Sequence, residues 1–79
     1  MDEKTIFKAF GTVLKRYRKA QSTTQEKLAL DTGFDRTFIS RMERGLTQPS
    51  VASLFQIAKS LKVPASDMII SVEAELKSK

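Results

Sequence analysis

The sequence contains neither cysteine nor histidine, and only three glycines and two prolines occur among its 79 residues. Without cysteine there are no disulfides or thiolate metal sites, and without histidine there is no imidazole ligand or histidine general base. The remaining catalytic options are serine–lysine or paired-carboxylate chemistry, and the paired acids Asp31 and Asp35 merely flank a turn. We therefore expect a protein that is not an enzyme and uses no cofactor or metal.

Long apolar runs are also missing. No stretch approaches the roughly 20 apolar residues that a membrane-spanning helix requires. The N-terminal sequence MDEKTIFKAF begins with acidic residues and lacks the apolar block of a signal peptide. We expect a cytoplasmic protein that does not associate with a membrane.

Basic residues outnumber acidic ones by 14 to 9, which gives a formal net charge of +5. The isoelectric point near 9.8 is in the range at which a polyanionic partner such as nucleic acid is a reasonable expectation. The alternative is an ordinary solubilising charge that marks no partner.

Apolar residues recur at helical spacing, and no stretch shows sustained strand alternation, so the predicted fold class is all-α. We expect a single domain. Its helices are expected at about 6–20, 25–31, 36–44, 51–62 and 65–71, between a frayed N-terminus at 1–5 and a C-terminal extension at 71–79. Val72 and Leu76 are four residues apart, which leaves open a helical continuation of that extension. The inward stripe of the fourth helix is expected to be Val51, Leu54, Ile57, Ala58 and Leu61.

Capping residues mark where the middle helices begin and end. Thr24, Asp35 and Ser50 each stand where a helix N-cap is expected. Gly33 is expected to take a left-handed conformation in the turn that follows the second helix. Gly45 is expected just beyond the end of the third helix.

Residues 24–44 therefore read as two short helices joined by a tight turn, which is the outline of a helix-turn-helix. On the second of these helices Ile39 and Met42 are expected to face inward. The outward strip is then formed by Arg36, Thr37, Ser40, Arg41 and Arg44. Arginines on such a strip can donate two hydrogen bonds to guanine or to phosphate. The alternative is a solvated basic face with no ligand.

Further candidate contacts surround this strip. Gln25 lies in the first turn of its helix, where a phosphate contact is expected. Thr24 is either such a contact or only a cap. Thr47 and Gln48 follow the second helix and are candidates for the next phosphate. Phe38 either packs in the core or contacts DNA. In the second case its ring would meet a thymine methyl group or sugars and would sense the local shape of the DNA.

Arg18 and Glu43 stand near the ends of the first and third helices. A salt bridge between them would fix the third helix to the rest of the domain. The alternative is two separate exposed charges.

A set of residues along most of the chain resembles the Cro/cI-type (XRE-like) helix-turn-helix family, in the lambda-repressor-like fold. The set comprises Thr24, Gln25, Leu28, Ala29, Gly33, Ile39, Ser40, Glu43, Arg44, Gly45, Pro49, Ser50, Leu54, Ile57, Ala58 and Leu61. The segment 35–40 with 43–45 is most similar to controller proteins of restriction–modification systems. Two positions depart from the family pattern, because Ser22 replaces the usual glycine and Thr23 replaces a large apolar residue. We expect a looser turn there and lower stability.

The resemblance implies a five-helix domain that binds double-stranded DNA as a homodimer, with the third helix of each protomer in a major groove. It places Arg36, Thr37, Ser40 and Arg41 at bases or adjacent phosphates, Gln25 at a phosphate, and an aromatic DNA contact at Phe38. It also supports the Arg18–Glu43 salt bridge, and it places the dimer surface at Ile69, Ile70 and Val72.

We therefore expect a transcription regulator that reads a near-palindromic operator. If it activates transcription, RNA polymerase would be a further partner. The alternative function is a protein-interaction module, such as an antitoxin-like partner that also binds its own promoter.

Overall fold

The computed structural model describes residues 1–78, and within that range it contains five helices and no strand. The helices are α1 (Glu3–Ala20), α2 (Gln25–Thr32), α3 (Arg36–Glu43), α4 (Val51–Ser60) and α5 (Ala65–Lys77). The predicted all-α class is confirmed. The observed helix boundaries differ most from the predicted ones at the two ends of the chain.

The prediction of a frayed N-terminus at 1–5 is wrong, because α1 already begins at Glu3. Asp2 caps the helix by accepting a hydrogen bond of 3.1 Å from the backbone N–H of Lys4. At the other end, α5 continues to Lys77 instead of ending near residue 71. The continuation has a physical reason, since Val72 is buried and Leu76 packs partly against the same core.

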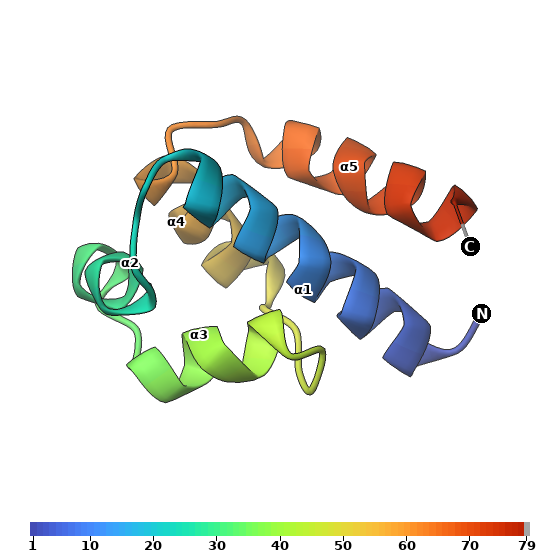
Figure 1. The fold of residues 1–79 in the computed structure, drawn as a ribbon, viewed down its shortest axis with the longest axis horizontal. Coiled ribbons are helices and arrows are strands. Elements are labelled where there is room, and N and C mark those ends of the chain that lie inside the picture. The colour runs from blue at the N-terminus through green and yellow to red at the C-terminus, as the bar shows by residue number, and fades with distance from the viewer. Residues whose placement is uncertain (79) are drawn as a thin grey trace.

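The long helix α1 lies across the middle of the molecule (Figure 1), where it packs against α5 on one side and α3 on the other. The short helix α2 contacts α3 and α4, and α4 contacts α5. The largest fully buried side chains come from all five helices or their ends: Val13, Leu14, Leu28, Ile39, Met42, Ile57, Leu61 and Met68. One shared core therefore fixes α3 against the rest of the domain.

Helix α4 departs from the prediction at its first residue. Leu54 and Ile57 are buried as expected, but the side chain of Val51 is 72% exposed and does not belong to the inward stripe. At about 100° per residue, Val51 lies at the edge of that stripe, on the side of the exposed Phe55. These two side chains contribute to a surface rather than to the core.

Candidate nucleic-acid interface

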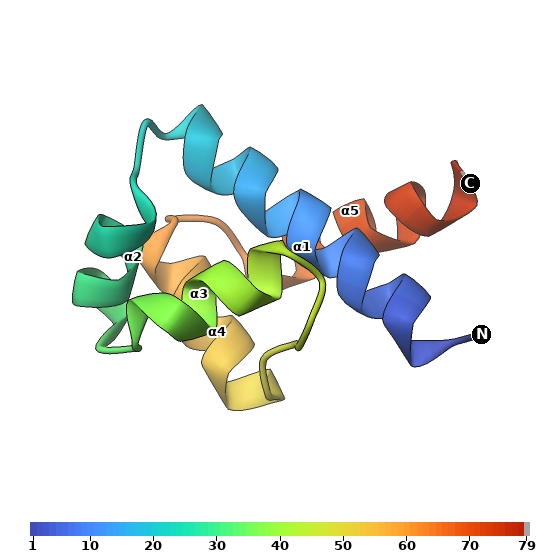
Figure 2. The same ribbon diagram turned by 60° about the horizontal axis from the view of Figure 1, so that its bottom comes forward.

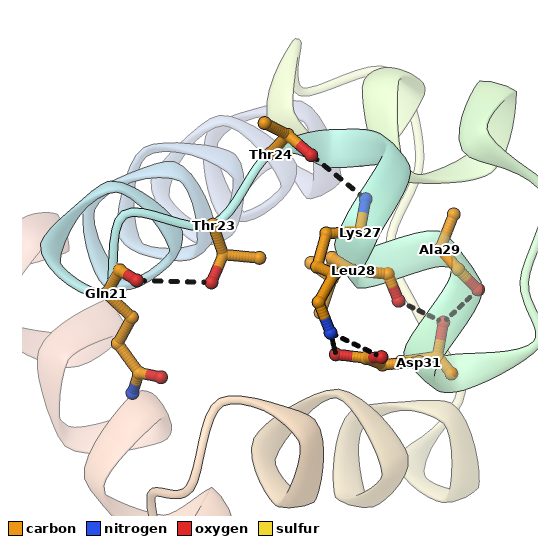
Figure 3. A network of polar contacts seen from close by, with 8 residues as sticks. Gln21, Thr23, Thr24, Lys27, Leu28, Ala29 and Asp31 are labelled. Atoms are coloured by element: carbon orange, nitrogen blue, oxygen red, sulfur yellow. Dashed lines mark hydrogen bonds and ion pairs between the residues drawn. The ribbon is translucent and has the colours of Figure 1, made fainter.

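The α2–turn–α3 unit is held by local hydrogen bonds that the residue types predict. Thr24 caps α2, since its hydroxyl accepts a bond of 3.0 Å from the Lys27 backbone N–H. At the other end of α2 the hydroxyl of Thr32 donates to the Leu28 carbonyl at 2.8 Å. Figure 3 shows the contact between Thr24 and Lys27. Gly33 then turns the chain with a φ of +77°, a left-handed conformation as expected from the sequence.

Helix α3 begins at a cap formed by Asp35, whose carboxylate accepts a bond of 3.1 Å from the Thr37 backbone N–H. Ile39 and Met42 are both fully buried, so this helix has one defined inward face. Gly45 follows its C-terminal cap with a φ of +75°, as expected for the residue that ends the helix.

The outward face of α3 carries the residues that the sequence analysis singled out. Arg36, Thr37, Arg41 and Arg44 are exposed, and Ser40 is partly exposed. None of the three guanidinium groups forms an ion pair within residues 1–78. They are therefore available to an anionic ligand, with two hydroxyl side chains beside them.

Phe38 is partly buried and packs against the core. Its ring meets that of Phe34 edge to face, with 5.6 Å between the centroids and an interplanar angle of 71°. The packing role that the sequence left open is thus present, and the contact of Phe38 with DNA stays a prediction.

Arg18 and Glu43 form a bidentate ion pair that joins α1 to α3. The guanidinium donates from Nε to Glu43 Oε2 at 2.6 Å and from Nη2 to Oε1 at 2.9 Å, and a third bond of 2.7 Å reaches the carbonyl of Thr23. Hydrogen bonding to the Glu43 carboxylate raises the pKa of Arg18 above its ordinary value, although burial acts in the opposite direction. The carboxylate of Glu43 is only 3% exposed.

Gln25 belongs to the same network instead of extending freely towards solvent. Its amide Nε2 donates to Glu43 Oε1 at 3.0 Å. An amide nitrogen carries two hydrogens, so one N–H remains for a phosphate oxygen. The network therefore sets the orientation of the Gln25 side chain at the start of α2.

Gly11 permits a close approach of α1 to α3 that the sequence analysis did not detect. A Cβ atom at this position would collide with the carbonyl oxygen of Met42 and would lie 2.8 Å from that of Glu43. An isolated glycine within a helical pattern was the available signal. Because no other residue fits at this contact, Gly11 controls how closely the two helices pack.

The loop after α3 holds the remaining polar candidates, with Thr47 partly exposed and Gln48 exposed. Both follow the C-terminal end of α3 in the chain. Their contact with phosphate stays a prediction.

A separate apolar face lies on α4 and α5. Ile69 is 44% exposed and Ile70 is 61% exposed, as expected for a contact surface, but Val72 is 7% exposed and belongs to the core instead. Val72 falls on the Met68 side of α5, four residues further along the helix. Val51 and Phe55, which the sequence analysis did not assign to this face, complete it and line a shallow hollow with Ile69 and Ile70.

Residues 1–78 contain no group of three or more acidic side chains placed to hold a metal ion. No helix in that range has both the length and the apolar character needed to cross a bilayer.

The fold and the α2–α3 geometry define a helix-turn-helix protein, and comparison with known families gives the same result. The helix-turn-helix family HTH_3 matches residues 14–68, so the chain belongs to this family. The uncharacterized HTH-type transcriptional regulator y4dJ of Sinorhizobium fredii is 31% identical over 62 residues, which cover 78% of this chain and 80% of that protein. Control protein C.BamHI of Bacillus amyloliquefaciens is 36% identical over 61 residues, covering 76% and 75% of the two chains.

Among solved structures, the restriction–modification controller protein C.Esp1396I aligns with a TM-score of 0.84 at 30% identity, covering 94% of this chain and 96% of that one. The same controller protein has been crystallised as a tetramer with its natural 35 base-pair operator. Relatives also include longer regulators, and the chain spans only 33–43% of four of them.

Proposed function

We propose that the chain is a sequence-specific, double-stranded DNA-binding transcription regulator with no catalytic role. One observation supports this function above the others. Ile39 and Met42 are fully buried on one face of α3, while the other carries three arginines that form no ion pair with any residue of 1–78. A short helix that presents bidentate donors and small hydroxyl side chains suits the major groove, whose base edges carry a distinct donor and acceptor pattern.

Two roles are assigned to the residues of this interface. Four residues of α3 read bases: Arg36, Thr37, Ser40 and Arg41. Six residues contact the DNA backbone or sense its shape: Thr24, Gln25, Phe38, Arg44, Thr47 and Gln48. Phosphate contacts fix the position of the protein on the duplex, and base contacts specify the sequence.

The active species in this proposal is a homodimer, with residues 1–79 forming one domain in each protomer. The exposed apolar residues Val51, Phe55, Ile69 and Ile70 form the contact, because a two-fold pairing would bury the same patch on both copies. Two recognition helices related in this way read a near-palindrome whose half-sites are about 34 Å apart.

The biological role proposed is that of a restriction–modification controller protein in the cytoplasm. The similarity to C.BamHI and to the operator-bound C.Esp1396I supports this role. RNA polymerase is the further partner in the case of activation.

Selection of binding sites from random duplex DNA tests the proposal directly. The expected result is an enriched motif with two related half-sites in inverted orientation. Recovery of no enriched motif from a folded protein would exclude sequence-specific binding.

A protein-interaction module is the second candidate, and one observation favours it. Leu30 on α2 is 79% exposed and lies apart from the α4–α5 face, beside a shallow depression that includes Glu26 and Phe34. In this alternative the chain is itself the antitoxin-like module, and its protein partner binds at this depression. A gel-shift experiment with duplex DNA at moderate salt separates the two functions, because a pure interaction module would leave the DNA unshifted.

A further inference from the structure

Helix α1 carries an excess of positive charge that the proposed interface does not use. Its six basic residues are accompanied by a single acidic one, Glu3. Arg16 is paired with Glu75 on α5 at 3.1 Å, and Arg18 is paired with Glu43. The four remaining basic residues are exposed and form no ion pair within residues 1–78: Lys4, Lys8, Lys15 and Lys19.

Two of these lysines occupy the part of α1 that extends beyond the end of α3. Along one row of α1, Gly11 touches the last turn of α3, and Lys8 touches Gly45, the residue just beyond the C-terminal cap. A Cβ atom at Gly45 would lie 2.8 Å from Lys8 Cγ and 3.0 Å from its Cα. The aliphatic stem of Lys8 therefore covers this glycine, which is buried even though it lies in a loop.

Lys4 lies four residues before Lys8 on the same row of the helix, about 6 Å further along its axis. In Figure 2 the N-terminal half of α1 continues past the end of α3 and the loop that follows it. Asp2, the N-cap residue that precedes α1, accepts a capping hydrogen bond from the backbone N–H of Lys4.

The positive charges thus continue from one helix to the other. Arg41 and Arg44 are exposed in the last turn and at the cap of α3, Lys8 follows beside Gly45, and Lys4 follows Lys8. A lysine on a flexible stem binds phosphate as a point charge and carries no base specificity.

We propose that Lys4 and Lys8 form a lysine edge that binds DNA phosphates next to those contacted by α3. This inference rests on the proposed function, because it extends the same DNA interface. The lysine edge adds two phosphate contacts per protomer and therefore increases affinity without changing the preferred sequence.

The salt dependence of binding tests the lysine edge. The variant Lys4→Gln/Lys8→Gln keeps the length and polarity of the side chains but removes both charges. The matched control is Lys59→Gln/Lys62→Gln, which removes two exposed charges from the end of α4 and the turn after it. Each lost phosphate contact lowers the slope of log affinity against log salt by about 0.9.

For the lysine-edge variant we expect a slope smaller by about 1.8 per bound protomer and an unchanged selected motif, whereas the control keeps the wild-type slope. A variant slope equal to that of the control overturns the lysine edge. Neutral methylphosphonate linkages, introduced one at a time into the selected duplex, give a second readout. The phosphates affected by the lysine variant should be those at which neutralisation weakens wild-type binding but no longer weakens the variant.

A purely structural role for Lys8 gives a different result. A cation beside the C-terminal carbonyls of α3 would stabilise that helix through its dipole. Its loss would then lower the unfolding midpoint and leave the salt slope unchanged, which overturns the proposal. If the wild-type protein selects no DNA motif, the proposed function itself fails, so the two failures are distinguishable.

Discussion

The guanidinium of Arg18 and the carboxylate of Glu43 meet side by side, with Nε 2.6 Å from Oε2 and Nη2 2.9 Å from Oε1. This pair connects the end of α1 to the end of α3, and its Glu43 oxygen also accepts a bond from Gln25 on α2. One carboxylate therefore joins α1, α2 and α3, which include the helix-turn-helix. The bidentate geometry restricts the rotation of α3 more than a single contact would.

Removal of one partner of this pair should destabilise the fold strongly. Arg18→Met leaves the Glu43 carboxylate buried without its main partner, so we expect a loss of about 3–5 kcal/mol in the free energy of unfolding. Chemical denaturation measures this loss. The double variant Arg18→Met/Glu43→Leu should recover most of it, because no uncompensated charge remains. Additive losses in the double variant would show that the pair is not coupled.

The pair should contribute to stability throughout the neutral pH range. Glu43 raises the pKa of Arg18 in the folded state, so this contribution is fully present below the ordinary pKa of arginine. It disappears only when the pH rises through the raised value. The difference in denaturation midpoint between wild type and Arg18→Met, measured at several pH values in the neutral range, should therefore contain a constant contribution from the ion pair.

The turn between α1 and α2 offers a gain in stability. Ser22 has a φ of +53°, a left-handed conformation that glycine adopts without steric cost. Since such a conformation costs a residue with a Cβ about 1–2 kcal/mol, Ser22→Gly should stabilise the protein by about 0.5–1 kcal/mol after the entropy cost of glycine. The control Ser66→Gly lies inside α5 and should destabilise instead, by about 1 kcal/mol at most. Thermal unfolding should show a higher midpoint than wild type for Ser22→Gly and a lower midpoint for Ser66→Gly.

The apolar face of α4 and α5 should control the oligomeric state. Ile70→Glu places a charge on a residue that is 61% exposed, so the protomer should fold normally but no longer dimerise. Leu30→Glu is the matched control, because it introduces the same charge at an exposed leucine on α2. Sedimentation at several concentrations measures both. If Leu30→Glu dissociated the dimer and Ile70→Glu did not, the dimer contact would lie outside the apolar face of α4 and α5.

Base reading and backbone contact should separate in two variants. Arg41→Ala should lose about 1–3 kcal/mol of discrimination at one base position in each half-site. Gln25→Ala should weaken binding nearly equally on all sequences, because its remaining amide N–H is assigned to a phosphate. Arg16→Ala is the control, since that arginine is paired with Glu75 on α5. Affinities for a set of single-base operator variants distinguish these patterns.

The local features of the fold were predictable because they depend on residues near one another in the sequence. Caps at Thr24, Asp35 and Ser50 follow from side chains that can accept a backbone N–H two or three residues later. The face of α3 followed from the spacing of Ile39 and Met42.

Features that depend on distant helices were not predictable in the same way. The burial of Val72 requires α5 to continue against α1. The contact of Gln25 with Glu43 likewise needs the fold, because the two residues are 18 positions apart.

The close contact at Gly11 leads to a prediction whose sign opposes helix propensity. Alanine is favoured over glycine inside a helix by about 1 kcal/mol, so an unconstrained site would be stabilised by the change. At Gly11 the new Cβ would collide with the Met42 carbonyl and crowd that of Glu43, and neither backbone atom can move without shifting α3. We therefore expect Gly11→Ala to destabilise the protein by about 1–3 kcal/mol.

The same variant should also weaken DNA binding, because α3 carries the base-reading side chains and would be displaced from its position on α1. Thr12→Ala is the control in the same helix, where the side chain is exposed and the change should be neutral or stabilising. The free energy of unfolding and the operator affinity, measured on both variants, test this prediction. A Gly11→Ala protein as stable as wild type, with unchanged affinity, would mean that the α1–α3 distance does not control the position of the recognition helix.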